Sequence, residues 1–166
     1  RLTILTATSG DTGSAVAGGF YGVEGIDVVV LYPEGKVSDL QERQMTTLGE
    51  NIHPLRVRGD FDDCQRVVKE IFAHDEFRGS YNVTSANSIN ILRWLPQSFY
   101  YFYAWCVWYK NVGVKNPMVV TPSGNYGNIA SGMLARKMGL PIKGFVVASN
   151  ANDIIPHYLS TGEYRP

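Results

Sequence analysis

The sequence has no excess of charge of either sign. Its 166 residues include 15 Lys and Arg and 15 Asp and Glu, which gives a formal net charge of zero. A protein without a basic field has no general attraction for nucleic acid or for an anionic membrane surface. We therefore expect neither as a partner, and any binding of an anion must depend on local groups.

Cysteine is scarce as well. Cys64 and Cys106 form no C-x-x-C motif, which argues against a structural zinc site. The three aspartates at residues 60, 62 and 63 precede a stretch of helical periodicity, where capping accounts for them, so we predict no metal site. Reduced thiols are typical of a cytoplasmic protein, and this is the expected location.

Long apolar runs are missing. The most aromatic stretch, residues 99–109, is shorter than the roughly 20 apolar residues of a membrane span, and its Tyr and Trp side chains carry polar groups. We expect a core helix, or a helix shared between domains or subunits. The chain starts with Arg1 on a strand pattern, without a signal peptide, and it reads as a piece of a longer protein cut at both ends.

Short runs rich in Val and Ile alternate with stretches of helical periodicity. This rhythm predicts βα units around a parallel sheet, and therefore an α/β protein. Pro96 precedes the aromatic run, and we expect the chain to pass from one lobe to another near it. Strands are expected near 2–7, 27–32, 52–57, 117–121 and 143–148, and helices near 13–22, 38–48, 61–74, 88–111 and 127–138.

Two loops with glycine and small polar residues each follow a strand and open a helix. Glycine allows tight turns, and the unpaired N–H groups of a helix start favour a negative ligand group. A capped turn would explain either loop alone, but two in one chain favour a small ligand with phosphate or carboxylate. The first loop is neither a dinucleotide fingerprint nor a P-loop. The loops contain Thr8, Ser9, Gly10, Asp11 and Thr12, and Ser123, Gly124, Asn125, Tyr126, Gly127 and Asn128.

The two loops differ in charge. A carboxylate at Asp11 beside a bound anion is unfavourable unless a cationic group, such as the ammonium of an amino acid, lies between them. The second loop has no Lys or Arg nearby in sequence. A phosphate held there by backbone dipoles and neutral side chains is typical of a resident cofactor.

A third cluster of polar residues lies at residues 85–93. If a helix begins near Ser88, Asn90 and Arg93 lie on one face of it and could clamp an oxyanion. The alternative is that Asn87 or Ser88 merely caps the helix and that Arg93 is solvated. For this segment alone, the alternative is the better explanation.

Together, A-T-S-G-D-T-G-S-A at residues 7–15, N-S-I-N-x-x-R at 87–93 and S-G-N-Y-G-N at 123–128 resemble threonine synthase, a family of pyridoxal-phosphate enzymes in the tryptophan synthase β-like group. The resemblance extends over essentially the whole chain. It implies an α/β fold of two lobes, with three-layer, open, mostly parallel sheets and flanking helices. Residues 1–95 would be most of the smaller lobe, and residues 96–166 the beginning of the larger one.

The resemblance also implies an activity, the conversion of O-phospho-L-homoserine and water to L-threonine and phosphate with pyridoxal phosphate as cofactor. The first loop, Thr8 to Thr12, would receive the substrate carboxylate beside the cofactor ring. The cluster of Asn87, Ser88, Asn90 and Arg93 would face the substrate phosphate. The second loop, Ser123 to Asn128, would hold the cofactor phosphate.

One element of the family pattern is missing. The lysine that forms a Schiff base with the cofactor lies before the first loop in the family, and the group facing the pyridine nitrogen would lie beyond Pro166. We therefore expect no catalytic residue in this chain, little or no cofactor binding and no activity by itself, and the aromatic run could mediate self-association. The alternatives are a related enzyme such as threonine dehydratase or cysteine synthase, and a non-catalytic metabolite-binding module.

Overall fold

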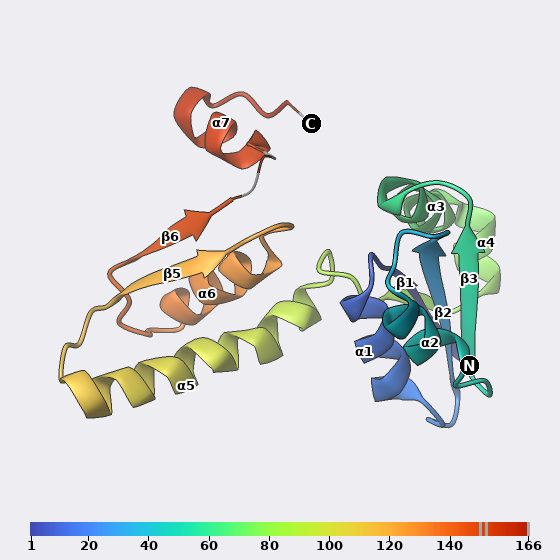
Figure 1. Cartoon of the computed structure of the whole chain (residues 1–166), viewed down its shortest axis with the longest axis horizontal. Coiled ribbons are helices and arrows are strands. Elements are labelled where there is room, and N and C mark those ends of the chain that lie inside the picture. The colour runs from blue at the N-terminus through green and yellow to red at the C-terminus, as the bar shows by residue number, and fades with distance from the viewer. Residues whose placement is uncertain (150, 152, 166) are drawn as a thin grey trace. The chain divides into compact units, whose positions relative to one another are not determined.

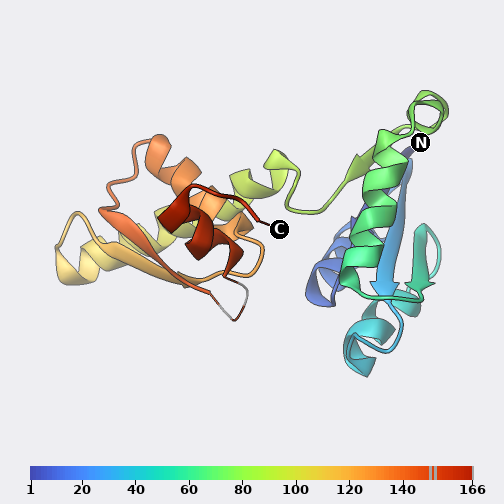
Figure 2. The same cartoon turned by 90° about the horizontal axis from the view of Figure 1, so that it is seen from above.

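The structure is a computed structural model that describes residues 1–149, 151 and 153–165. The chain divides into two compact units, Arg1–Ile89 and Asn90–Pro166. Figure 1 and Figure 2 show the elements of each unit in two views. The boundary predicted from the sequence, after residue 95, lies within the first helix of the second unit, so this helix belongs to that unit from its start.

The first unit is built on a four-stranded parallel sheet. The strands run in the order β3-β2-β1-β4, and every neighbouring pair is parallel. Four helices join and follow these strands (Figure 1). The elements are β1 (Leu2–Ala7), α1 (Asp11–Phe20), β2 (Ile26–Pro33), α2 (Asp39–Thr46), β3 (Ile52–Val57), α3 (Phe61–Ala73), α4 (Asp75–Ser80) and β4 (Val83–Ser85).

Helices cover both faces of this sheet because alternate residues of each strand point to opposite sides. Ile4 and Val28 pack with residues of α1 and α2, including Met45, which is completely buried. Leu5 and its neighbours on the other face pack with α3. The result is a three-layer arrangement in which the central strands β1 and β2 are buried on both sides.

Two sets of polar contacts join the elements of this unit. Asn51 is buried before β3, and its side-chain amide donates to the carbonyls of Phe20 and Ile26 at 2.8 and 3.0 Å while its oxygen accepts the Gly22 N–H at 2.9 Å. These bonds close the turn between α1 and β2.

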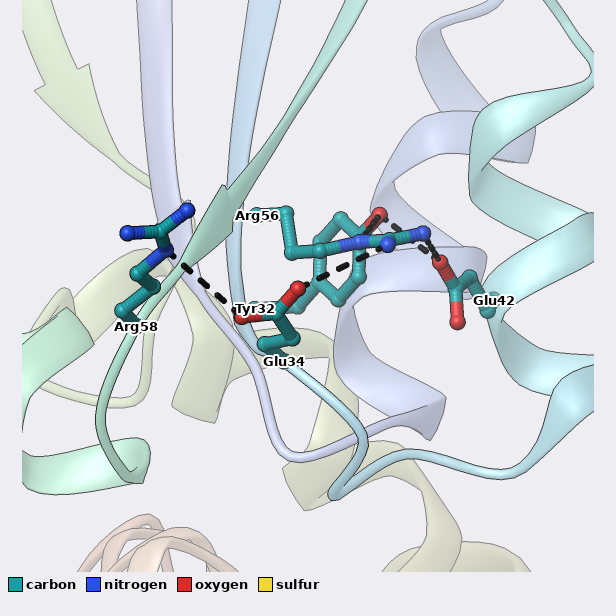
Figure 3. A network of polar contacts seen from close by, with 5 residues as sticks. All are labelled: Tyr32, Glu34, Glu42, Arg56 and Arg58. Carbon is teal, nitrogen blue, oxygen red and sulfur yellow. Dashed lines mark hydrogen bonds and ion pairs between the residues drawn. The ribbon is translucent and has the colours of Figure 1, made fainter.

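The second set lies at the ends of β2 and β3 (Figure 3). The Tyr32 hydroxyl donates to Glu42 of α2 at 3.1 Å, and Arg56 contacts Glu42, Tyr32 and, at 3.8 Å, Glu34. Arg58 lies 4.0 Å from Glu34. The contacts with Tyr32 and Glu42 raise the pKa of Arg56 above its ordinary value, but exposed ion pairs of this kind add little to stability.

The second unit has a smaller sheet. Strands β5 (Met118–Pro122) and β6 (Gly144–Ala148) are parallel, and α5 (Trp94–Val112) and α6 (Gly127–Lys137) pack against each other. Buried residues of α6 and the loop after it form a core with aromatic side chains of α5, namely Tyr101, Phe102 and Trp105. A 3₁₀ turn, η1 (Ile91–Arg93), precedes α5, and α7 (Ile154–Thr161) follows β6. None of the helices in the described part of the chain combines the length and apolar character that a membrane span needs.

The prediction that a helix begins near Ser88 is wrong. The chain forms a turn at residues 88 and 89, and the helix α5 begins only at Trp94. Asn90 caps the 3₁₀ turn by accepting the Leu92 N–H at 3.0 Å. Pro96 explains the late start, because proline fits the first turn of a helix but would clash with the preceding turn farther inside.

Candidate functional site

The loops after β1 and β4 meet at the position where the order of strand addition reverses. From β1 the chain adds β2 and β3 on one side, and it then returns to add β4 on the other side of β1. Both strands are parallel to β1. In open α/β sheets, ligands bind outside the carboxyl ends of the strands at such a switch point.

The loop after β1 is held by Thr8. Its side chain is 1% exposed, and its hydroxyl accepts the N–H groups of Gly10 and Gly13 at 2.9 and 2.8 Å and donates to the Gly10 carbonyl at 3.1 Å. Gly10 has a φ of 146°, which side chains rarely permit. Ser9 and Asp11 are exposed. The loop therefore uses Thr8 internally and presents its other side chains outward.

Asn87 ties the loop after β4 to the end of β1. Its side-chain oxygen accepts the Ala7 N–H at 2.9 Å, and its side-chain nitrogen donates to the Ala7 carbonyl at 2.7 Å. Its own N–H donates to the Ser85 hydroxyl at 3.1 Å. Asn87 thus extends the pairing between β1 and β4 beyond the end of β4.

The structure divides the third predicted cluster between the two units. Asn87 and Ser88 belong to the first unit, and Asn90 and Arg93 to the second. Arg93 is half-buried at the end of the 3₁₀ turn. Asn90 and Arg93 are therefore neighbours in a 3₁₀ turn rather than on one face of an α-helix.

The loop after β5 exposes backbone N–H groups. Tyr126 has a φ of 62° and forms the start of α6 without a side-chain cap. The Gly127 N–H reaches the Asn125 side chain at 3.3 Å, whereas no hydrogen bond among the described residues takes up the N–H groups of Gly124, Asn125 and Tyr126. These groups lie at the positive end of the helix dipole, where an anion is favoured.

Polar side chains hold this second loop in place. Ser123 is buried and its hydroxyl donates to the Asn128 side-chain oxygen at 2.7 Å. The Asn128 nitrogen donates to the Pro122 carbonyl at 2.7 Å and to the Thr121 hydroxyl at 3.3 Å. Tyr101 of α5, which the sequence did not single out, donates to the Asn128 carbonyl at 2.7 Å. Burial raises the pKa of the Tyr101 hydroxyl, so it remains a donor at neutral pH.

Comparison with known proteins identifies the family. The family model of pyridoxal-phosphate-dependent enzymes matches residues 1–166. The chain belongs to the pyridoxal-phosphate-dependent enzyme family. Within that family, it is 52% identical over its whole length to threonine synthase from Haemophilus influenzae and spans 39% of that protein. It is 49% identical over 99% of its length to threonine synthase from Escherichia coli and spans 38% of that protein.

Solved structures of this enzyme family confirm the predicted α/β fold. The crystal structure of threonine synthase from Escherichia coli matches 99% of the chain with a TM-score of 0.89 and 48% identity, and the chain covers 38% of it. A threonine synthase from Brucella melitensis, solved with pyridoxal phosphate bound, matches 99% of the chain with a TM-score of 0.82 and 42% identity, and the chain covers 35% of it. Maize serine racemase shares the fold at 16% identity, with a TM-score of 0.69. The match covers 98% of this chain and 45% of the racemase chain.

The loop after β5 fits the phosphate of the family's cofactor. A Cβ built on Gly124 meets nothing within 4 Å, so the glycine leaves open space beside free N–H donors. Every lysine of the sequence is exposed, and none lies in either glycine-containing loop; they are Lys36, Lys69, Lys110, Lys115, Lys137 and Lys143. The loop after β5 therefore combines open space with N–H groups that have no partner among the described residues, and neither predicted binding loop contains a lysine.

Proposed function

We propose that this chain supplies the substrate loop and the cofactor-phosphate loop of a threonine synthase, which converts O-phospho-L-homoserine and water to L-threonine and phosphate. The observation that carries the proposal is the identity of 48–52% to bacterial threonine synthases over nearly the whole chain. Solved structures with other activities, such as maize serine racemase and a variant of O-ureido-L-serine synthase, match the fold at 16 and 18% identity. This difference gives no support to a dehydratase, a cysteine synthase or a non-catalytic module.

In this proposal, the loop after β5 binds the cofactor phosphate through the N–H groups of Gly124, Asn125 and Tyr126. Ser123 and Asn128 act indirectly, because their side chains bind one another and the loop backbone. Gly127 opens α6 and adds the dipole of that helix. Pyridoxal phosphate, when bound, supplies the electron sink for the reaction, while the protein orients it.

The loop after β1 binds the amino-acid end of the substrate. Ser9 and Thr12 offer hydroxyl groups, and the carboxylate of Asp11 suits the cationic nitrogen that accompanies the substrate carboxylate. Thr8 and Gly10 shape the loop rather than contact the ligand, since the Thr8 hydroxyl is bonded to the loop backbone on both sides.

The substrate phosphate is assigned to Ser88, Asn90 and Arg93. A guanidinium group can hold two phosphate oxygens at once, and neutral hydroxyl and amide donors add hydrogen bonds without a further charge. Asn87 positions this segment through its two bonds to Ala7.

The direct test is an assay of the complete protein that carries this chain. We expect release of phosphate and formation of L-threonine from O-phospho-L-homoserine, and no turnover by residues 1–166 alone. The encoded sequence before Arg1 should contain a lysine between a strand and a helix. Absence of such a lysine, or turnover of unphosphorylated amino acids only, would overturn the proposal.

Gly124→Ala tests the phosphate cradle separately. The new methyl group meets no protein atom within 4 Å, so the unfolding midpoint should not change, but the methyl would occupy space beside the phosphate. In the complete protein that carries this chain, we expect weaker binding of pyridoxal phosphate, measured by absorbance as the cofactor is titrated into the apoprotein. Gly18→Ala is the matched control, because its methyl is equally unhindered and lies on α1. Equal cofactor affinity in both variants would refute the cradle.

Arg93→Ala tests the assigned substrate-phosphate contact. We expect a higher KM or a lower kcat for O-phospho-L-homoserine, with unphosphorylated analogues unaffected. Arg43→Ala on the exposed surface of α2 is the control for loss of a positive charge. An equal loss with phosphorylated and unphosphorylated substrates would remove Arg93 from the phosphate site.

We also propose a cytoplasmic location, which the two free cysteines support. The isolated chain should self-associate through one stripe of α5, where Phe99, Tyr100, Tyr103 and Val107 are between 43 and 74% exposed. These residues follow helical spacing. Sedimentation should show a mass that rises with concentration, and Tyr103→Lys should lower it. A monomer at all concentrations would contradict this proposal.

A further inference from the structure

We propose that Gln41 is a positioning residue for the substrate loop, and that it fixes the orientation of the Asp11 carboxylate. The inference rests on the proposed function for its consequence in catalysis, but its structural basis lies entirely within the first unit. In the sequence, Gln41 follows Ser38 by three residues, which is the spacing of a capping box. The structure adds a contact between this cap and a residue thirty positions away.

The capping box at the start of α2 sets the orientation of the Gln41 amide group. The Gln41 side-chain oxygen accepts the Ser38 N–H at 3.1 Å, and the Gln41 N–H donates to the Ser38 hydroxyl at 3.3 Å. A backbone N–H can only donate, so the oxygen of the amide must face Ser38. The amide nitrogen must therefore face the other way.

On that other side lies the loop after β1. The Gln41 nitrogen donates to the Asp11 Oδ1 atom at 2.7 Å. The same amide lies over Gly10, since a Cβ built on Gly10 would come within 2.5 Å of the Gln41 Cδ and Nε2 atoms. Gly10 is thus required both for its φ of 146° and for the close approach of Gln41.

The contact leaves one Asp11 oxygen for a ligand. Among the described residues, Gln41 is the only side chain that donates to the Asp11 carboxylate, and it uses Oδ1. Asp11 is exposed, so Oδ2 remains available to a cationic group. Gln41 acts through Asp11 and needs no contact with the substrate itself.

Gln41→Glu separates this role from helix capping. Glutamate at the third helical position completes a capping box as well as glutamine does, so α2 should remain intact. Its second oxygen would instead face the Asp11 carboxylate, and like charges at this distance repel. Gln44→Glu is the matched control, because it makes the same change of charge on an exposed position of the same helix.

The experiment compares both variants in the complete protein that carries this chain. We expect Gln41→Glu to raise KM for O-phospho-L-homoserine about tenfold or more, because this corresponds to the loss of one hydrogen bond to a charged group. We expect a smaller effect on kcat. Hydrogen exchange at the Gly10 and Gly13 amides should become faster, while α2 keeps its protection. Gln44→Glu should change neither.

The outcomes are distinguishable from a failure of the proposed function. If the unmodified protein turns over the substrate and Gln41→Glu leaves KM unchanged, the positioning role is refuted and the function stands. If the unmodified protein has no such activity, the proposed function fails, and hydrogen exchange decides on Gln41 alone. Unchanged hydrogen exchange in the loop after β1 would then refute the proposal that Gln41 orients Asp11. Faster exchange confined to this loop would support it.

Discussion

Two threonines two residues apart should respond in opposite directions to the same substitution. Thr6 in β1 and Thr8 directly after it are both completely buried, at 0 and 1% exposure. The Thr6 hydroxyl finds no hydrogen-bond partner among the described residues. The Thr8 hydroxyl makes three hydrogen bonds with the loop backbone. Valine has nearly the same shape as threonine and lacks the hydroxyl, so Thr→Val isolates this difference.

The magnitudes follow from the partners that are left behind. Thr8→Val deprives two buried N–H groups of their acceptor, and at about 1–3 kcal/mol for each unsatisfied group we expect a loss of ~2–6 kcal/mol in the free energy of unfolding. Thr6→Val removes a buried hydroxyl that is itself unsatisfied, so it should stabilise the unit by ~1 kcal/mol. Differences in strand propensity and side-chain volume are nearly the same for both variants and largely cancel.

Denaturant unfolding monitored by circular dichroism measures the two free energies. Native-state hydrogen exchange at Gly10 and Gly13 locates the change, because the amides that bind the Thr8 hydroxyl should exchange faster in Thr8→Val only. Thr8→Ser keeps the hydroxyl and should keep the protection of both amides. If Thr8→Val is as stable as Thr6→Val, the Thr8 hydroxyl does not hold the loop after β1.

Three further substitutions test other parts of the structure. Asn51→Ala removes three hydrogen bonds from a buried turn and should cost ~2–4 kcal/mol in thermal unfolding; a loss below ~0.5 kcal/mol would contradict the assigned contacts. Gly132→Ala places a methyl 2.7 Å from Tyr101 and 2.8 Å from Phe145, and the overpacked second unit should lose ~1–3 kcal/mol, so an unchanged melting temperature would show that α6 can shift. Hydrogen bonds from the Asp60 N–H and from Arg66 lower the pKa of Asp63 below 3.8. The ionised Asp63 therefore stabilises the folded chain fully above pH 3.8, and this stabilisation is lost as the pH falls through the lowered pKa. The difference in urea stability between the unmodified chain and Asp63→Asn should therefore shrink in acid, and a constant difference would refute the assignment.

Local chemistry made much of the fold predictable. Ser38 and Gln41 have the spacing of a capping box, and the structure forms that box at the start of α2. The aspartates at the start of α3 also act as predicted, since Asp60 and Asp63 form a second capping box. Caps are readable because their partners lie three residues apart, so no knowledge of the tertiary structure is needed.

Elements that depend on distant partners were harder to predict. The strand β4 has only three residues, Val83–Ser85, and its pairing with β1 bridges some eighty positions of the chain. A strand this short has no periodicity to detect. The late start of α5 could have been predicted from Pro96, because a helix that began at Ser88 would place proline in its interior.

The polar residues of the two loops show the main limit of the sequence for this site. The resemblance to threonine synthase assigns Thr8, Asn87, Ser123 and Asn128 to the binding of substrate or cofactor. In the structure, the side chains of Thr8, Asn87 and Asn128 bond to backbone groups of the loops, and the Ser123 hydroxyl donates to the Asn128 side chain. A tight turn leaves its N–H and C=O groups without regular partners, so it needs such side chains whether or not a ligand binds.

The same reasoning supports the binding groups proposed for the loop after β5. Once side chains hold the backbone of the loop after β5, its remaining N–H groups at Gly124, Asn125 and Tyr126 are left for an anion. Substitution of Ser123 should therefore weaken cofactor binding together with the stability of the second unit, whereas Gly124→Ala should weaken binding alone. If the Ser123 side chain contacted the ligand directly, its substitution would instead weaken binding and leave stability unchanged. This contrast separates a residue that builds a site from one that contacts its ligand.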